Sequence, residues 1–354
     1  MTLELNRKYP VLVTGIGGGG HGEQILKALQ LAGRYLIIGA DANDECANRH
    51  VVDHFAVLPR ANDPKYLEEV VALAKRFTCR AIFHGSEAEM VVLSQQREKL
   101  EALGLYVPVN PPSVMEICQD KAATMAFLSA QGVRVPLFRE VSAFTDLEGF
   151  DHFPVVIKPS RGGGGSANVF IVQNRAELEL FASYLLGIYE SFILQEYVGT
   201  PNQEYTVGVL FGADGRMLNS IAIRRLVNNA LTIRTSIPNR SGRAELGSNL
   251  IISTGISQGY VGDWPEVRAQ CERIATALHP RAPINIQCRL VNDIVIPFEI
   301  NPRFSGTTSL RAMVGYNEPD CLFRRDVLGE PVEVNFPYRR GLILRSLHES
   351  LVTP

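Results

Sequence analysis

Several signals that would assign this 354-residue chain to a broad class are missing from it. No apolar run approaches membrane-spanning length, and the N-terminus MTLELNRKYP lacks the basic-then-apolar layout of a signal peptide. Lysines and arginines form no basic block, and the formal net charge is −2, so no nucleic-acid or membrane partner is indicated. With 46% hydrophobic and 20% charged residues, the chain can bury ordinary cores, and we expect a cytoplasmic enzyme.

Signatures of nucleophilic, redox and P-loop chemistry are also missing. The six cysteines are scattered, and no pair has the spacing of a metal knuckle or a redox motif, so we expect reduced thiols. No Ser-His-Asp or Cys-His arrangement is evident. The glycine-rich segments lack the Gly-Lys-Ser/Thr ending of a Walker A loop.

The first third of the chain alternates between predicted strands and helices, which predicts a parallel sheet covered by helices. The expected strands span 11–15, 36–39, 81–84 and 105–107, and one helix is expected over 87–103. The segment PVNPPS at 108–113 is a proline-rich break, and a single helix is expected from 113 to 131.

The rest of the chain has a different pattern. Residues up to 198 predict a compact α+β unit, and longer strands separated by turns follow, which favours an antiparallel sheet. We therefore predict a Rossmann-like parallel βα domain over 1–112, a small lid subdomain with a helical linker over 113–198, and a C-terminal subdomain over 199–354 that carries the metal and substrate site.

The segment VLVTGIGGGGHGE, starting at Val11, places a glycine-rich turn between a strand and a helix. Such a turn can hold a dinucleotide, and Asp41 lies at roughly the spacing of a ribose-binding acid. An NAD-dependent oxidoreductase is therefore one alternative, although a lone glycine fingerprint is weak. The turn could also form an anion site facing the cleft, with His21 lining it or serving only structure.

The segment IPFEINPRF places Glu299, Asn301 and Arg303 two residues apart, so they begin on one face of a strand. Gln287 lies on the preceding strand and can sit beside Glu299 in a hairpin. Oxygen ligands with few charges suit Mg²⁺, and a neighbouring arginine suits phosphoryl oxygens. The alternative is a surface hairpin with a few polar residues.

Two lysines and a glycine loop give a second candidate. Lys158 ends an apolar strand and precedes Arg161 and the glycines 162–165, whose N–H groups can turn toward phosphates in a loop that closes over a substrate. Lys121 follows Asp120 on an earlier helix, where a solvated surface lysine is the alternative.

In order and spacing, these motifs resemble the ATP-grasp family, in the group similar to the carbamoyl-phosphate synthase large chain. The motifs are DKAAT, VVIKPSRGGGGS, QEYV, the pair Glu204-Tyr205, NIQ and FEINPRFSGTTS, all between residues 120 and 310. The segment GSEAEM at 85–90 resembles the family's usual N-terminal domain. The fold implied is the parallel βα domain followed by a two-part ATP-grasp module.

The resemblance implies ATP and two Mg²⁺ (or Mn²⁺) ions as cofactors, and it implies a role for each motif. Arg303 and Lys158 would assist phosphoryl transfer, and Arg303 would stabilise the transferring group. The implied metal ligands are Gln287, Glu299 and Asn301. The implied ATP-binding residues are Lys121, Lys158, Gly162, Gly163, Gly164, Gly165, Ser166, Glu196, Val198 and Glu204.

Substrate-binding residues follow less directly. The loop Ser305-Gly306-Thr307 opens the next helix, where it could bind an anionic substrate or simply cap the helix. Among Arg224, Arg225 and Arg234 in the predicted central strands, we favour Arg225 as the group that holds the acceptor carboxylate, with a catalytic role, and Arg224 as a second substrate contact.

The resemblance implies an ADP-forming ligase that phosphorylates a small carboxylic acid and couples the acyl phosphate to an amine. The phosphorylation of another small carboxylate or carbamate is an alternative within the family, and a non-catalytic nucleotide sensor is one outside it. The segment after Arg303 differs from that of biotin carboxylases, which argues against biotin. Dimers are common in the family, so a homodimer is one expectation.

Overall fold

The computed structural model describes residues 8–18, 20–162 and 167–347. Sixteen strands are named in these ranges: β1 (Tyr9–Val13), β2 (Tyr35–Asp41), β3 (His54–Val57), β4 (Ala81–Phe83), β5 (Phe138–Val141), β6 (Val155–Pro159), β7 (Phe170–Val172), β8 (Phe192–Glu196), β9 (Glu204–Phe211), β10 (Met217–Arg225), β11 (Ile233–Pro238), β12 (Asn249–Ser253), β13 (Gly259–Val261), β14 (Ile284–Val291), β15 (Ile294–Asn301) and β16 (Gly341–Ile343).

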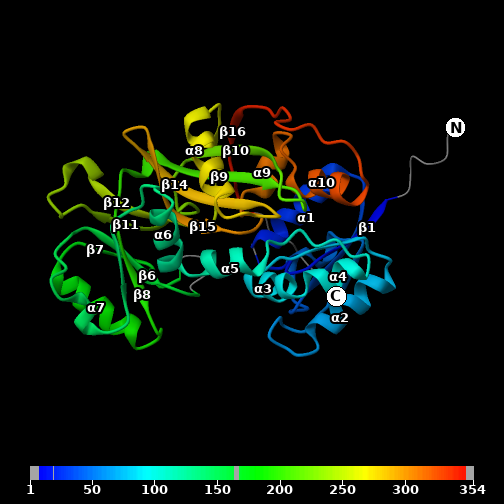
Figure 1. Ribbon diagram of the computed structural model, residues 1–354, viewed down its shortest axis with the longest axis horizontal. Coiled ribbons are helices and arrows are strands. Elements are labelled where there is room, and N and C mark those ends of the chain that lie inside the picture. The colour runs from blue at the N-terminus through cyan, green and yellow to red at the C-terminus, as the bar shows by residue number, and fades with distance from the viewer. Residues whose placement is uncertain (1–7, 19, 163–166, 348–354) are drawn as a thin grey trace.

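The helices connect and cover these strands (Figure 1). The α-helices are α1 (His21–Ala32), α2 (Tyr66–Arg76), α3 (Glu87–Gln95), α4 (Arg97–Ala102), α5 (Pro112–Gln119), α6 (Lys121–Ala130), α7 (Arg175–Leu186), α8 (Pro265–Thr276), α9 (Thr308–Met313) and α10 (Glu318–Leu322). Single helical turns are η1 (Ala47–His50), η2 (Phe144–Leu147), η4 (Pro201–Gln203), η5 (Ala244–Leu246) and η6 (Phe323–Val327). No helix among the described residues has the length and apolar character needed to span a membrane.

The N-terminal sheet is parallel, with strand order β3-β2-β1-β4, and it confirms the predicted βα architecture. Three local predictions were wrong. Residues 105–107 form no strand, and Tyr106 makes only an isolated parallel bridge to Ala81. The helix expected over 87–103 breaks at Gln96, and the one over 113–131 breaks at Asp120, which caps α6 by accepting from the Ala123 N–H at 2.9 Å.

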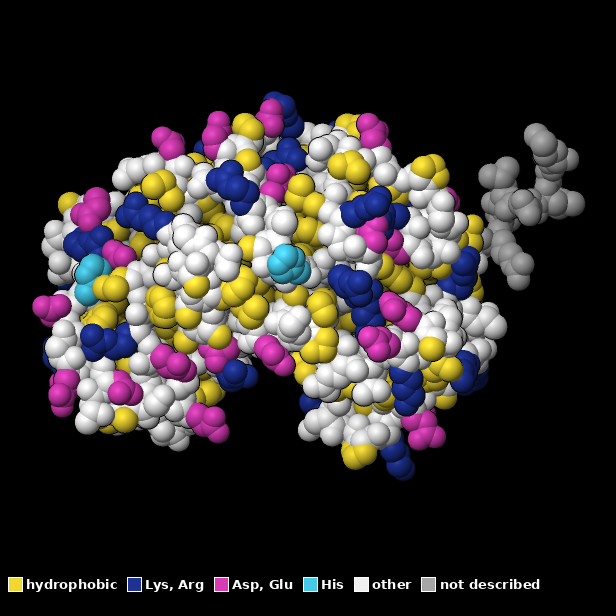
Figure 2. Space-filling model, in the orientation of Figure 1, with side chains coloured by type: hydrophobic (Ala, Val, Ile, Leu, Met, Phe, Trp, Pro, Cys, Tyr) yellow, Lys and Arg dark blue, Asp and Glu magenta, His cyan; other side chains and the backbone are white. Residues whose placement is uncertain are grey.

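The lid is an antiparallel sheet of order β5-β8-β6-β7 with its own apolar core, which α7 covers. It forms one lobe of the molecule and the N-terminal sheet forms the other (Figure 1). The surface is hollowed between the two lobes (Figure 2). The lid therefore stands apart from the N-terminal sheet.

The largest sheet is antiparallel, in the order β15-β14-β9-β10-β13-β16, as the strand pattern after residue 204 predicted. Helix α8 packs on one face, where alternate β9 residues such as Val207 and Val209 join its apolar residues. The hairpin β11-β12 leaves this sheet and packs against the lid through a cluster that includes Tyr197, Leu246 and Leu250.

One apolar core joins the beginning and the end of the chain. Val11, Val13 and Phe83 belong to the same buried cluster as Phe304 and Phe323. The Phe83 and Phe304 rings lie 6.1 Å apart, and the Phe323 ring lies 5.2 Å from that of Tyr35. The predicted regions 1–112 and 199–354 therefore share a core, and our three-part division stays a prediction about chain organisation.

Candidate active site

The polar residues of IPFEINPRF lie on one face of the largest sheet. In the register of β14 and β15, Gln287 lies opposite Glu299 and Asn285 opposite Asn301. In the register of β14 and β9, Gln287 lies opposite Thr206 and Arg289 opposite Glu204. Residues opposite one another in an antiparallel pair share a face. Gln287 and Glu299 therefore lie side by side, as the sequence predicted.

Lys158 crosses from the lid to this face. Its ammonium donates to the Phe298 carbonyl at 3.0 Å, and the side chain is buried. Burial lowers the pKa of Lys158 to about 8, with Lys121 acting in the same direction and the Glu299 carboxylate opposing. Burial alone would raise the pKa of Glu299, but Lys158, Lys121 and other donors hold it below its usual value. The charges of Lys158 and Lys121 therefore favour the ionised form of Glu299.

Arg303 lies at the end of this polar row. Its guanidinium donates to the Asn301 side-chain oxygen at 3.1 Å, to the Phe304 carbonyl at 3.0 Å and to Glu87 of the N-terminal domain at 2.8 Å. Asn301 in turn donates to Glu299 at 3.0 Å. The guanidinium thus links the candidate metal ligands to the first residue of α3.

Two buried histidines lie close to Arg303. The Nε2 atom of His21 and the Nδ1 atom of His84 are 3.2 Å apart. Burial lowers the pKa of His84 to about 3 and that of His21 well below its usual value, and the charge of Arg303 adds to both shifts. The pair is therefore neutral at physiological pH. Whether His21 lines an anion site at the glycine turn or serves only structure stays a prediction.

Lys121 and the start of the glycine loop are held together. The Lys121 ammonium donates to the Gly162 carbonyl at 3.2 Å, and Arg161 pairs with Asp120 at 2.9 Å. Gly162 has φ +73, a conformation that favours glycine. The predicted phosphate contacts of Gly163, Gly164, Gly165 and Ser166 lie outside the described residues.

The segment QEYV joins the lid to the largest sheet. The Glu196 N–H donates to the Leu137 carbonyl, and its carboxylate accepts from Arg243 at 3.2 Å. Arg289 donates to the Val198 carbonyl at 2.9 Å. The Glu196 side chain is thus taken up by protein groups, so its predicted contact with adenine would use the backbone.

Glu204 and Arg225 form a buried ion pair instead of lining an open pocket. Their side chains are 3% and 2% exposed, and the Arg225 guanidinium donates to Glu204 at 2.8 Å and to the Thr254 carbonyl at 2.7 Å. Glu204 also accepts from Arg289 at 3.1 Å and from Ser253 at 2.6 Å. This corrects the expectation that Arg225 is free to hold an acceptor carboxylate. Ribose binding by Glu204 stays a prediction, one that requires these bonds to rearrange.

Arg224 and Arg234 do not line the site either. Arg224 lies opposite Tyr205, on the face covered by α8, and its guanidinium stacks 5.1 Å from the Trp264 ring. Arg234 is exposed on the β11-β12 hairpin, outside the largest sheet. Strand alternation put Arg224 and Arg225 on opposite faces, but the residues alone did not say which face carries Glu299.

The Ser305-Gly306-Thr307 loop turns its hydroxyls inward. The hydroxyls of Ser305 and Thr307 lie 2.5 Å apart, and that of Ser305 accepts from the Thr307 N–H at 2.9 Å. Both residues are buried. Their burial and mutual contact count against the expectation that these hydroxyls contact substrate, and Thr307 makes no side-chain capping bond to α9 either. Gly306 is partly exposed and keeps its predicted place.

The N-terminal glycine turn packs against protein. The positive φ of Gly15 brings it against Gly85, where an added Cβ would lie 2.9 Å from the Gly85 carbonyl carbon. These residues follow β1 and β4, the neighbours between which such a sheet binds dinucleotides. Asp41, the candidate ribose ligand, accepts from the Gly17 N–H at 2.8 Å. This geometry favours a structural turn over an NAD site.

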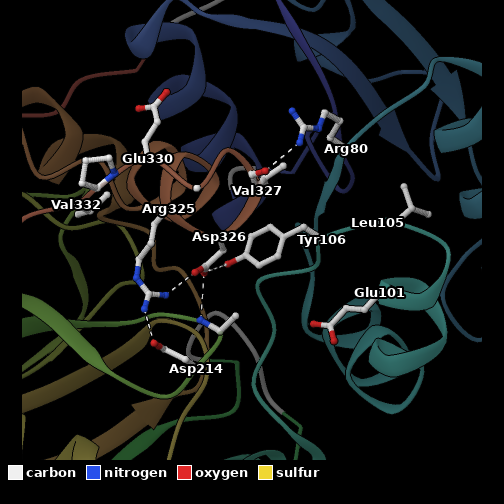
Figure 3. Close-up of a pocket in the computed structure, with 14 residues that line it drawn as sticks. Arg80, Glu101, Leu105, Tyr106, Asp214, Arg325, Asp326, Val327, Glu330 and Val332 are labelled. Atoms are coloured by element: carbon white, nitrogen blue, oxygen red, sulfur yellow. Dashed lines mark hydrogen bonds and ion pairs between the residues drawn. The ribbon is translucent and has the colours of Figure 1, made fainter.

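A separate cavity of about 790 Å³ lies at the start of β4, whereas Gly85 and Glu87 follow the end of that strand (Figure 3). Arg80 precedes β4 and donates to the Val327 carbonyl at 2.9 Å, whereas Glu87 follows β4. Tyr106 donates to Asp326 at 2.8 Å, and Arg325 pairs with Asp214 and Asp326 (Figure 3). The wall of this cavity therefore combines residues from 80–106, 213–214 and 325–332, and it does not include Arg303.

Comparison with known proteins agrees with the motifs. A family model described as the PylC-like N-terminal domain matches residues 11–108, and one described as ATP-grasp in the biosynthetic pathway with Ter operon matches residues 189–349. Over residues 189–349 the chain is therefore similar to ATP-grasp proteins. The two matched ranges contain the glycine turn and GSEAEM in the first, and QEYV, NIQ and FEINPRF in the second.

Relatives of this chain include D-alanine–D-alanine ligase A of Bacillus cereus, 30% identical over 129 residues, which are 35% of this chain and 41% of that protein. The chain thus matches about two fifths of that relative's length. Its fold resembles L-amino acid ligase from Bacillus licheniformis (TM-score 0.61, 18% identity, 90% of this chain and 74% of the other). It also resembles N5-carboxyaminoimidazole synthetase from Staphylococcus aureus complexed with ADP (TM-score 0.64, 15% identity, 96% and 81%).

Two residues near the site were missed in the sequence. Glu87 pairs with Arg303 across the domain boundary, and Arg345 donates to the Gly306 carbonyl at 2.9 Å. Glu87 lies inside GSEAEM, so the motif could have pointed to it. Nothing in the local sequence marks Arg345, because only the fold brings residue 345 to residue 306.

Proposed function

We propose that this protein is an ATP- and Mg²⁺-dependent, ADP-forming ligase of the ATP-grasp family. It phosphorylates a small carboxylic acid and joins the acyl phosphate to an amine. The observation that carries the proposal is the common placement of Gln287, Glu299 and Asn301 on one sheet face, with Lys158 of the lid bonded to the carbonyl of Phe298, the residue before Glu299. The names of the relatives, ligases that act on amino acids, support the same reaction class.

The proposed metal ligands fit Mg²⁺ in their chemistry. They offer one carboxylate and two amide oxygens, and the described residues hold no group of three or more His, Cys, Asp or Glu side chains suited to a metal. A set with so little charge suits an ion that shares its coordination shell with phosphate oxygens. When bound, Mg²⁺ would neutralise charge on the transferring phosphoryl group.

The protein's own residues would do the rest by position and charge. Lys158 and Lys121 would hold phosphate oxygens, since Lys158 is bonded to the carbonyl of the residue before Glu299 and Lys121 to the start of the glycine loop. Arg303 would stabilise charge on the transferring phosphoryl group, after sharing or releasing Glu87. The lid would keep water from the acyl phosphate.

The test is phosphate release from Mg-ATP across amino acids and small carboxylic acids, singly and in pairs, with mass detection of products. We expect a pair-dependent signal and a product lighter than the pair by one water. Glu299→Gln should lower turnover at least about 100-fold while ADP still binds, because it removes the carboxylate from the metal set. Glu179→Gln, an exposed i,i+4 partner of Arg175, is the matched control. Normal turnover by Glu299→Gln would refute the metal assignment.

A further inference from the structure

Arg345 follows β16 and turns its guanidinium back into the protein. The guanidinium donates to the Gly306 carbonyl at 2.9 Å and to the Gln24 side-chain oxygen at 3.0 Å, and it lies 3.4 Å from the Ser309 hydroxyl. Its backbone N–H donates to Gln258 at 3.2 Å. All four partners are uncharged. Among the residues that the structure describes, no carboxylate forms an ion pair with Arg345.

Within the part of the chain that the structure describes, this partly buried positive charge has no paired carboxylate. Burial lowers the pKa of Arg345, and only the Glu23 carboxylate, which already pairs with Lys27, acts in the other direction. Removing a guanidinium from water is costly unless an anion compensates. Other buried guanidinium groups of this protein, those of Arg225, Arg289 and Arg311, each face a glutamate.

Arg345 and Arg303 hold the same short loop. Arg303 donates to the Phe304 carbonyl, and Arg345 donates to the Gly306 carbonyl. Carbonyls two residues apart in one chain can be separated by at most about 7 Å. Gly306 also abuts residue 255, since a Cβ added to Gly306 would lie 2.9 Å from the Gly255 carbonyl oxygen. The Arg303 and Arg345 guanidinium groups therefore each hold a carbonyl of one short loop, and the nitrogens that donate to it lie at most about 13 Å apart.

We propose that Arg345 binds a second carboxylate of the substrates, distinct from the carboxylate that is phosphorylated beside Arg303. The substrates would then include an amino acid or a dicarboxylic acid, and simple monocarboxylic acids with simple amines would be poor. A guanidinium recognises a carboxylate through a pair of parallel hydrogen bonds. This inference rests on the proposed function, because it places the second anion relative to the reacting group.

Binding tests this without turnover. Isothermal titration of the full chain with MgADP would compare succinate with succinamate, and L-alanine with L-alaninamide, each pair differing in one carboxylate. We expect the dicarboxylate or the amino acid to bind about 10- to 100-fold more tightly than its amide, the range for hydrogen bonds to a charged group. A preference in the first pair that is lost in Arg345→Gln assigns the second carboxylate to the donor, and such a preference in the second pair assigns it to the acceptor.

Variants separate recognition from structure. Arg345→Gln should lose the preference for the carboxylate over its amide, and Arg345→Lys should keep part of it. Arg340→Gln is the control and should leave this preference intact, because Arg340 is an exposed partner of Asp263 on the same segment. An equal preference in Arg345→Gln, or no preference in the parent protein, overturns the proposal. A preference that depends on Arg345, in a protein that releases no phosphate with any pair, would refute the proposed function and leave the carboxylate site standing.

Discussion

A substitution of Glu204 distinguishes two roles for this residue. The family resemblance implies that Glu204 binds ribose, whereas the structure places it in a buried ion pair with Arg225. The Glu204→Gln substitution keeps the shape of the side chain and removes its charge. In the structure, this leaves Arg225 and Arg289 buried without their shared anion. Breaking a buried ion pair by removing one partner costs about 3–5 kcal/mol. The free energy of unfolding should fall by that amount.

The size of the effect makes it measurable by calorimetry. Unfolding entropies of about 2.1 cal/mol/K per residue convert about 3–5 kcal/mol into a fall in Tm of about 4–7 °C for 354 residues. Glu179→Gln, at an exposed pair, should change Tm by less than 1 °C, in line with the small contribution of about 0.5 kcal/mol expected there.

The same variant tests the alternative. If Glu204 serves mainly to bind ribose, Glu204→Gln would keep the Tm of the ligand-free protein and weaken ATP binding. A Tm within 1 °C of the parent, with ATP affinity lowered tenfold, would refute the structural reasoning.

The ion pair also predicts a pH dependence of stability. Burial would raise the pKa of Glu204, but Arg225 and Arg289 hold it below its usual value. The pair should therefore stabilise the fold above about pH 4.5, the ordinary carboxyl pKa, and lose that effect at lower pH.

Three further predictions follow from other contacts. Burial lowers the pKa of Lys158 to about 8, so ATP affinity measured by titration should fall as pH rises through 8. Between pH 8 and the ordinary lysine pKa only the unfolded state keeps this proton, so the contribution of Lys158 to the free energy of unfolding should rise with pH there. A flat affinity profile in which Lys158→Met matches the parent would exclude this lysine from the ATP site. Tyr106→Phe should lower stability in urea by about 0.5–1.5 kcal/mol by removing the bond to Asp326, whereas an unchanged midpoint would mean that this bond contributes nothing. Gly15→Ala should destabilise by more than about 1 kcal/mol, and by more than Gly33→Ala, which shares the positive φ but meets open space; equal losses would show that the contact with Gly85 costs nothing.

The sequence predicted what depends on local pattern. Strand alternation placed Glu299, Asn301 and Gln287 on one face because the turn between β14 and β15 is short, and the register confirms it. The helix breaks at Gln96 and Asp120 were missed, because neither position carries the glycine or proline that marks most helix ends.

Long-range partners could not be predicted from the sequence. We expected Arg225 to bind substrate because the sequence does not show that it pairs with Glu204. That pairing depends on how β9, β10 and β12 meet in the fold. Arg345 had no local signal at all, since its contact with Gly306 spans 39 residues and an intervening sheet strand. Such pairings follow from the whole fold, and a single sequence does not record them.

The core shared by both ends of the chain bears on how this protein is made. A ribosome releases β1 to β4 long before Phe304 and Phe323, which pack against Phe83 and Tyr35. Until then, apolar side chains on one face of the parallel sheet lack part of their cover, a state prone to aggregation. The lid has its own apolar core, so it can fold before Phe304 and Phe323 are synthesised. We therefore expect the core of the lid to form before the core of the N-terminal sheet is complete.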